Sequence, residues 1–323
     1  MKKVVLLTTG GTIASKRDEK TGLLVAGALT GEELAAMCEL STGIDVQVES
    51  VFQVPSNRMD VEKLIALKNK IEAVLNDEAV AGVVVTHGTD TLEETAYFLD
   101  LTLDDARPVI VTGSMRGPED MGTDAFVNLR NSLIAAASEA MKHTGVTVVF
   151  NEKIFSARYV KKVHASNVDG FAAPGYGYIG IIDGDEVIVN QKPLHRETYQ
   201  IGDHLPVVDI ITFYLGADGK FVKASVASGA RGIILEGFGR GHVPPKAVRA
   251  IEDAVKRGVV AVLTTRAEQG QVKEAYQFPG GVSDLKRRGV ILGKDYDSKK
   301  ARIKLAVLLA AGWDVSDIAK AFE

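Results

Sequence analysis

The sequence predicts an α/β protein with two domains. The N-terminal domain is expected to be the larger, with a mostly parallel sheet and flanking helices, and the C-terminal domain to be a smaller parallel α/β domain. Apolar β-branched segments alternate with amphipathic helical segments, which favours parallel sheets. The chain has 323 residues, enough for two domains. We therefore predict an N-terminal α/β domain over residues 1–190, a linker over 191–206 and a C-terminal α/β domain over 207–323.

The first domain begins as a repeated strand–helix pattern. The apolar runs predicted as strands are Val4–Thr8, Val46–Phe52, Val83–Val85, Pro108–Thr112 and Val146–Phe150. The segments predicted as helices are Glu32–Leu40, Asp60–Leu75, Thr91–Leu103 and Asp124–Met141. Asp60 is expected to cap its helix, and Thr91 with Glu94 fits a capping box. Residues 18–31 carry charge and glycine without a period, which indicates a mobile, lid-like loop.

The pattern changes after residue 150. Short extended pieces punctuated by glycine predict a hairpin-like region over 151–190, and 191–206 carries two prolines, several charges and no clear period. The second domain repeats the alternation. Its predicted strands are Val207–Leu215, Gly232–Leu235 and Val259–Thr265, and its predicted helices are Lys220–Ser228, Pro244–Arg257 and Ser298–Ala311. Pro244 and Pro245 before a helix, and Gly258 after it, follow the usual helix-boundary preferences.

Composition excludes several classes of protein. The formal net charge is −4, so no overall basic field favours nucleic acid or anionic membrane. Cys38 is the single cysteine, which rules out an internal disulfide and a cysteine-based metal cluster and favours a buried structural thiol. The N-terminus reaches a turn too early for a secretory signal, and no apolar run is long enough for a membrane span. We expect a cytoplasmic protein without a metal or cofactor.

Hydroxyl side chains follow three of the predicted strands. Thr12, Ser56 and Thr89 lie in turns at strand ends, where open α/β sheets bind ligands. A threonine hydroxyl becomes a nucleophile when a nearby group removes its proton or stabilises its alkoxide. Asp90 is too close in sequence to act on Thr89, but it can hold a cation such as a lysine or a substrate ammonium.

Each of these features also has a structural interpretation. The Gly10-Gly11-Thr12 segment is by itself a tight turn, and it lacks the glycines and lysine of a dinucleotide or phosphate loop. His87 alone in a turn is typical of a hydrogen-bonded structural histidine. Thr91 is better explained as a helix cap than as a catalyst, and Lys161-Lys162 as solvated charges on a strand.

Together the turns resemble the two signatures of bacterial asparaginases and glutaminase-asparaginases. The matching segments are Thr8–Ala14, Thr86–Thr91, Glu93–Ala96, Thr112–Arg116 and Asn128–Ala137, with weaker likeness at Gly237–Gly241 and Lys299–Leu309. The two signatures occur in the expected order and at about the expected separation. The resemblance covers nearly the whole chain and implies hydrolysis of L-asparagine to L-aspartate and ammonia.

The resemblance also implies roles for individual residues. Thr12 would attack the side-chain amide, and ammonia would leave from an acyl-enzyme. Thr89 would act with Asp90 and with a lysine, for which Lys162 is a better match than Lys161.

Substrate binding would use the same turns. Asp90, with Thr89 beside it, would hold the α-ammonium with help from Asn57, and Ser56 would bind the α-carboxylate. The backbone at Ser114 would help to place the scissile amide. The resemblance further implies a homodimer or homotetramer with the site between subunits.

The chain departs from the family pattern in two places. The family usually has a tyrosine in the loop after the first signature, whereas this chain has none between Ser15 and Ser41, and Leu23–Ala26 occupies that stretch. The C-terminal domain usually lends an asparagine and a glutamate to a neighbouring site. Here the first position matches Arg240, and only Asp284 lies near the second.

These departures leave alternatives open. A glutaminase-asparaginase of relaxed specificity differs by one methylene in its substrate, which a pocket resolves by only about 1–3 kcal/mol. D-Asparagine and the amidase subunit of a tRNA-dependent amidotransferase are related possibilities, although the latter is expected to carry an additional N-terminal domain. A non-catalytic amino-acid sensor on the same fold is an alternative of a different class. A nucleotide-binding protein is a third, weakened by the missing glycine fingerprint.

Overall fold

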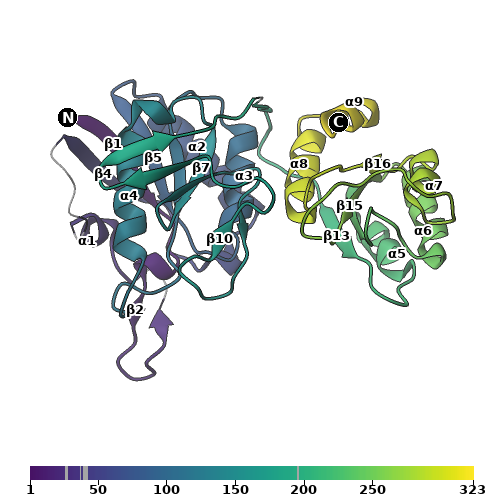
Figure 1. The fold of residues 1–323 in the computed structure, drawn as a ribbon, viewed down its shortest axis with the longest axis horizontal. Helices are drawn as coiled ribbons and strands as arrows, with labels where there is room; N and C mark the ends of the chain where they lie inside the picture. Colours follow the sequence, from purple (N-terminus) through teal and green to yellow (C-terminus); the bar gives the residue numbers. More distant parts are fainter. Residues whose placement is uncertain (26–27, 37, 39–42, 195) are drawn as a thin grey trace. The chain divides into compact units, whose positions relative to one another are not determined.

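The computed structural model describes residues 1–25, 28–36, 38, 43–194 and 196–323. The chain forms two compact units, Met1–Thr198 and Tyr199–Glu323. Their boundary lies within the 191–206 stretch that was predicted as a linker. Each unit is an α/β structure (Figure 1). Among the described residues, no helix is both long enough and apolar enough to cross a bilayer.

Unit 1 has an eight-stranded mixed sheet. Its order is β12-β11-β8-β7-β6-β5-β1-β4. The parallel strands are β1 (Lys2–Thr8), β4 (Ile44–Ser50), β5 (Val80–Thr86), β6 (Val109–Thr112) and β7 (Val146–Phe150). The antiparallel extension consists of β8 (Lys153–Ser156), β11 (Gly180–Asp183) and β12 (Glu186–Val189). The predicted parallel sheet and hairpin region are therefore both present.

Helices cover this sheet on both faces. They are α1 (Gly31–Ala36), α2 (Val61–Leu75), α3 (Leu92–Thr102) and α4 (Ala125–Ala137), with short 3₁₀ turns η1 (Thr12–Ala14), η2 (Ser56–Arg58) and η3 (Glu139–Met141). Helices α1 and α4 share one core cluster with Val4, Leu6 and Val84 of the sheet. Successive side chains of a strand point to opposite faces, so Val5 and Leu7 face the other side, where α2 and α3 contact the sheet.

Unit 2 has a four-stranded parallel sheet. Its order is β13 (Val208–Thr212), β14 (Gly232–Gly237), β15 (Val260–Thr265) and β16 (Ile291–Leu292). Its helices are α5 (Lys220–Ala227), α6 (Pro245–Lys256), α7 (Val282–Arg287), α8 (Ser298–Ala310) and α9 (Val315–Ala321). Helices α5, α6 and α7 share a core with one face of the sheet, and α8 contacts β13, β14 and β15.

Several local predictions are confirmed. Asp60 caps α2 by accepting a hydrogen bond from the Lys63 amide at 2.9 Å. Cys38 is buried, and burial raises the pKa of its thiol to about 11. The strand predicted over Val146–Phe150 has those bounds in the structure.

Other local predictions are wrong. Thr91 stands at the start of α3, but its hydroxyl caps no helix amide and instead donates to the Ser56 carbonyl at 2.9 Å. The helix predicted over 124–141 ends at Ala137, because Ser138 is extended with ψ 130°.

The predicted loop at 18–31 and the helix at 32–40 also differ from the structure. A short ladder between β2 (Lys16–Arg17) and β3 (Leu24–Val25) leads into and out of the loop. Helix α1 spans Gly31–Ala36, and the remainder of the helical prediction lies partly outside the described residues. Strand β16 and helices α7 and α9 were not predicted.

Candidate active site

Three turns meet at the carboxyl end of the unit 1 sheet because glycine lets their backbones touch. Gly11 follows β1 with φ 86°, and a Cβ atom built on it would lie 2.5 Å from the backbone nitrogen of Gly88. A Cβ atom on Gly88 would lie 2.7 Å from Oγ of Ser56. No side chain fits at either contact. Thr12 and Thr89 each come directly after one of the touching glycines, so the two threonines lie on adjoining turns.

Hydrogen bonds fix Ser56 against the turn after β5. Ser56 opens the 3₁₀ turn η2 and is buried. Its Oγ accepts a hydrogen bond from the Asp90 amide at 3.2 Å, and its carbonyl accepts the bond from Thr91 described above. Asn57 is next in the same turn with an exposed side chain. The turn after β4 therefore has one buried polar side chain that binds the Asp90 amide, followed by one that is exposed.

Lys162 joins Thr89 and Asp90 from a distant part of the chain. It lies in β9 (Lys161–Lys162), which pairs with β10 (Phe171–Ala172). Its Nζ donates to Oγ1 of Thr89 at 2.8 Å and to Oδ1 of Asp90 at 2.8 Å. The Lys162 side chain is 16% exposed and that of Asp90 is 68% exposed. The lysine is thus held mainly inside, while the carboxylate retains a face toward solvent.

The segment Gly113–Arg116 closes the same end of the sheet after β6. A Cβ atom on Gly113 would lie 2.4 Å from the His87 carbonyl oxygen and 3.5 Å from Cγ2 of Thr89. Ser114 is fully buried, and its hydroxyl donates to the Arg116 carbonyl at 2.6 Å. The Ser114 side chain is therefore hydrogen-bonded within its own turn, which leaves the backbone of Ser114 to contact a substrate.

His87 has a structural role, as the sequence predicted. Its ring is fully buried, with Nδ1 2.8 Å from the Gly88 carbonyl and Nε2 3.0 Å from Oγ1 of Thr95. Burial lowers the pKa of the imidazole to about 4. A neutral histidine then bridges the turn after β5 and helix α3, which holds Thr89 in place.

A surface hairpin is attached to this region. Arg17 in β2 pairs with Asp120, and its backbone amide donates to Oε2 of Glu119 at 3.1 Å. Asp120 also accepts from the Gly117 amide at 2.9 Å. Leu23, in the stretch where the family usually has a tyrosine, is 70% exposed. Ala26 of that stretch lies outside the described residues.

The two unit 2 residues behave differently from the group in unit 1. Arg240 has an exposed side chain in the loop after β14. Asp284 accepts hydrogen bonds from the Gly280 amide at 3.0 Å and from Nε of Arg288 at 3.1 Å. Burial alone would raise the pKa of Asp284, but these hydrogen bonds hold it below the usual value. Asp284 thus stabilises the start of α7.

The arrangement in unit 1 suits nucleophilic chemistry on a small polar molecule. It combines two threonines, a lysine that contacts one of them, a carboxylate and backbone amides in a mostly buried setting. In the described part of the chain, no three His, Cys, Asp or Glu side chains gather as they would around a metal ion. Sequence reasoning missed Asp124 and Asn128, which hold the Gly113–Arg116 segment. Their signal was only an aspartate just before a helix and one of several polar residues within that helix.

Comparisons with known proteins match both halves of the chain to family domains. Residues 3–195 match the family described as asparaginase, N-terminal, and residues 207–322 match the glutaminase/asparaginase C-terminal domain. An L-asparaginase of Bacillus licheniformis is 56% identical over 96% of each chain. A glutaminase-asparaginase of Pseudomonas fluorescens biotype A is 32% identical over 99% of this chain and 89% of the relative.

A solved structure is also similar in fold over the full length of the chain. The crystal structure of a probable cytoplasmic L-asparaginase from Campylobacter jejuni covers 100% of this chain and 99% of its own, with a TM-score of 0.91 and 33% identity. Both halves of the sequence match the corresponding family domains, and the fold matches over its full length. The chain therefore belongs to the asparaginase family.

Proposed function

We propose that this protein is an L-asparaginase that hydrolyses L-asparagine to L-aspartate and ammonia through a threonine nucleophile. The observation that carries the proposal is the contact of Lys162 Nζ with both Thr89 and Asp90 at 2.8 Å, on the turn that touches the Thr12 turn. Membership of the asparaginase family and the high identity to the Bacillus enzyme support the substrate.

In the first half of the reaction, Oγ1 of Thr12 bonds to the side-chain amide carbon of asparagine. The C–N bond then breaks, the nitrogen takes up the proton that Oγ1 of Thr12 gives up and leaves as ammonia, and an aspartyl ester remains on Thr12. In the second half, a water molecule attacks that ester. The proton of that water passes through the Thr89 hydroxyl to Nζ of Lys162, the ester bond breaks to release L-aspartate, and the proton returns to Oγ1 of Thr12.

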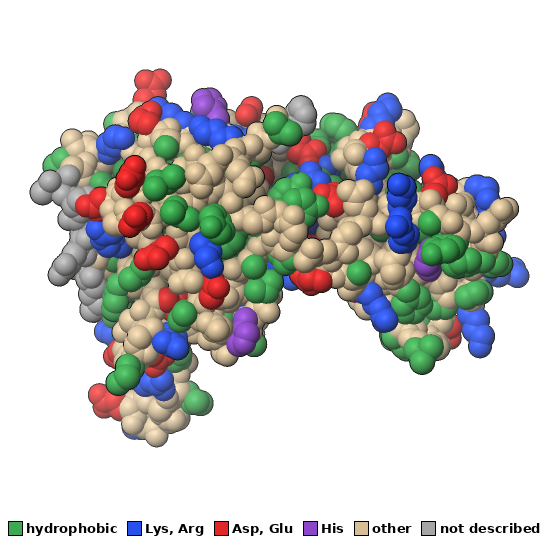
Figure 2. Space-filling model, viewed as in Figure 1, with side chains coloured by type: hydrophobic (Ala, Val, Ile, Leu, Met, Phe, Trp, Pro, Cys, Tyr) green, Lys and Arg blue, Asp and Glu red, His purple; other side chains and the backbone are tan. Residues whose placement is uncertain are grey.

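The remaining side chains hold the substrate. Asp90 binds the α-ammonium with its solvent-facing side and Asn57 assists, since both side chains are exposed and Asn57 follows Ser56, which binds the Asp90 amide. Ser56 binds the α-carboxylate and the Ser114 backbone places the amide. Neither step needs a cofactor. Both charge signs are mixed on the visible face of each unit (Figure 2), which supports a small-molecule substrate over nucleic acid.

The cellular setting and assembly follow the relatives. We propose a cytoplasmic enzyme, as the Campylobacter protein is described, and a homodimer or homotetramer in which a second copy completes the site. Light scattering on the active protein tests this assembly, and a fully active monomer would refute it.

The substrate is tested by ammonia release from L-asparagine, L-glutamine and D-asparagine in parallel. We expect L-asparagine to give the highest kcat/KM. Dominant release from another amide would keep the mechanism and change the substrate, and would direct attention to Arg240 and the 18–31 loop. Binding of asparagine without release of ammonia would support the sensor alternative and overturn the proposal.

A further inference from the structure

The Gly113–Arg116 segment is held by the buried polar pair Asp124 and Asn128, to which the proposed mechanism gives no role. Asp124 immediately precedes α4, and Asn128 lies one turn into that helix. Asn128 is fully buried and Asp124 is 8% exposed. Asp124 accepts from the Met115 amide at 2.9 Å and from the Arg116 amide at 3.0 Å. Two consecutive backbone amides after Ser114 are thus fixed by one carboxylate.

Asn128 fixes the other side of the same segment. Its Nδ2 donates to the Gly113 carbonyl at 2.9 Å and to Oδ2 of Asp124 at 3.0 Å. Its Oδ1 accepts from the Asn151 amide at 2.9 Å, at the turn between β7 and β8. The amide side chain therefore ties together the ends of β6 and β7 and the carboxylate of Asp124.

The orientation of Asp124 indicates that the pair serves the segment and not the helix. An aspartate at the N-cap position ordinarily accepts a hydrogen bond from a first-turn amide, which stabilises a helix by about 1 kcal/mol. Asp124 occupies that position but makes no side-chain cap bond, and both of its oxygens face the amides of Met115 and Arg116.

We propose that Asp124 and Asn128 are positioning residues for amide hydrolysis, because they fix the Ser114 backbone beside Thr89. This inference rests on the proposed function. Gly113, which Asn128 holds, contacts Thr89 and the His87 carbonyl closely, so movement of the segment changes the distance between the scissile amide and the threonines. A misplacement of about 1 Å costs on the order of a hundredfold in rate.

The test compares Asp124→Asn and Asn128→Ala with the unaltered full-length protein. Asp124→Asn keeps the size of the side chain but turns one acceptor into a donor, so it loses acceptance either from the Arg116 amide at Oδ1 or from Nδ2 of Asn128 at Oδ2. We expect kcat for L-asparagine to fall about 10- to 100-fold, whereas KM changes less than about threefold because Asp90 and Ser56 are untouched.

Ser132→Ala is the matched control. Ser132 is also fully buried on α4, but its hydroxyl donates only to a helix carbonyl, that of Asn128, at 2.7 Å. We expect it to lower the melting temperature while kcat stays within about twofold. If Asp124 and Asn128 had only a structural role, their variants would lose stability but keep kcat, as the control does. Unchanged kcat per folded molecule in both Asp124→Asn and Asn128→Ala would therefore overturn the positioning role and leave the proposed function intact.

The unaltered protein separates the two hypotheses. If it releases no ammonia from any amide, the proposed function fails and the positioning role fails with it. If it is active and Asp124→Asn does not fold, Asn128→Ala decides, because it removes side-chain atoms without adding a charge or a donor. A tenfold loss of kcat in that variant with KM unchanged supports the inference.

Discussion

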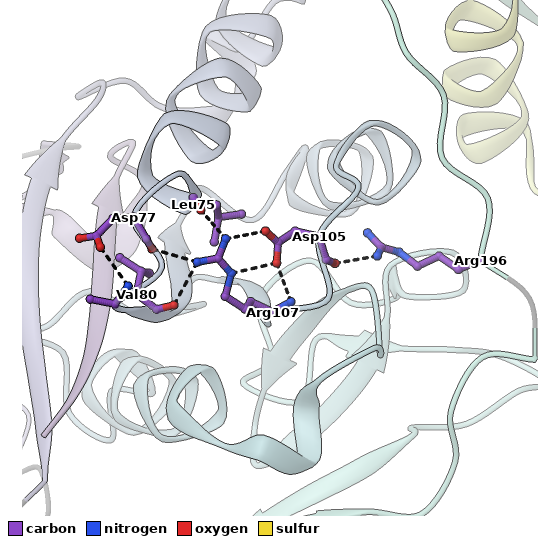
Figure 3. Close-up of polar contacts among 7 residues, drawn as sticks. Leu75, Asp77, Val80, Asp105, Arg107 and Arg196 are labelled. Atoms are coloured by element: carbon purple, nitrogen blue, oxygen red, sulfur yellow. Dashed lines mark hydrogen bonds and ion pairs between the residues drawn. The ribbon is translucent and has the colours of Figure 1, made fainter.

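The two ends of the unit 1 sheet both hold a basic side chain among polar groups, but they hold it differently. At the carboxyl end, Lys162 contacts the hydroxyl of Thr89 and the exposed carboxylate of Asp90. At the amino end, Arg107 lies just before β6 and is surrounded by acceptors (Figure 3). Those acceptors are the carbonyls of Leu75, Asp77 and Val80 and both carboxylate oxygens of Asp105.

The difference separates stability from chemistry. The planar guanidinium of Arg107 ties the end of α2 to the starts of β5 and β6, and its hydrogen bonds with Asp105 raise the pKa of the arginine. Burial opposes the ionised form of Asp105, yet the bonds from Arg107 hold its pKa below the usual value. Arg196 adds a bond to the Asp105 carbonyl at 2.8 Å. Every contact here joins parts of the protein to one another, whereas the Lys162 site retains an exposed carboxylate for a ligand.

The largest effect is expected at the carboxyl end, from Thr12→Ala. Loss of the nucleophile should lower kcat by at least about 10³-fold, because no ester can form, while the fold stays intact since Thr12 is only partly buried. Ammonia release and circular dichroism measure the two properties. Thr89→Val should reduce turnover comparably. If Thr12→Ala turned over L-asparagine as fast as the unaltered protein, Thr12 could not be the nucleophile.

Lys162→Met tests whether the Lys162 side chain, at the carboxyl end of the sheet, takes part in proton transfer. We expect kcat to fall by about 10²- to 10⁴-fold, the range typical of a lost general base. The methionine keeps the apolar stem, so the free energy of unfolding should change by less than about 1 kcal/mol. Urea unfolding and initial rates give both numbers. A large loss of stability with kcat retained would show that Lys162, like Arg107, serves stability, and would contradict the proposed difference between the two ends.

Arg107→Ala should give the opposite result at the amino end. Three backbone carbonyls and the carboxylate of Asp105 lose their partner, which should cost about 2–4 kcal/mol in unfolding free energy. kcat should stay within about twofold at temperatures well below the unfolding transition. Arg107→Lys is the control, because it keeps the charge but loses the planar guanidinium. Its unfolding free energy should lie between those of the unaltered protein and Arg107→Ala. A tenfold loss of kcat in Arg107→Ala would show that the two ends are not separate.

The smallest effect is expected from His87, at the carboxyl end of the sheet. Its protonation should make the unfolding free energy depend on pH. The pKa of about 4 in the folded protein lies below the usual histidine value of 6.5. The unfolded chain therefore binds the extra proton between these values, so stability falls as the pH falls from about 6.5 toward 4. Between pH 7 and 4.5 the loss from this group should be about 2–3 kcal/mol.

The measurement is urea unfolding at both pH values, with His87→Gln as the comparison. The variant should be less stable at pH 7 but should lose less stability on acidification. An equal loss in both proteins would show that His87 does not carry this dependence.

Much of the fold was predictable because burial patterns are local in sequence. The strand over Val146–Phe150 and the helix ending at Leu75 follow from periodicity and from the Asp60 cap. The capping box at Thr91 was wrong because the Ser56 carbonyl, 35 residues away, captures the hydroxyl. The short helices α7 and α9 were missed because six or seven residues carry too little periodic signal.

The candidate site divides in the same way. The signature residues Thr12, Thr89 and Asp90 could be proposed from the sequence, and in the structure Lys162 contacts Thr89. The catalytic roles of these residues stay predictions. Asp124 gave no such signal. An aspartate before a helix predicts a cap, and only the position of the Gly113–Arg116 segment turns its carboxylate away from the helix.

The central claim is that a covalent bond forms at the carboxyl end of this sheet, on Thr12. Rapid quenching of the protein with L-asparagine, followed by mass analysis of its peptides, tests this directly. We expect an added aspartyl group on the peptide that contains Thr12 and none in Thr12→Ala. An aspartyl group on the peptide that contains Thr89 would contradict the account.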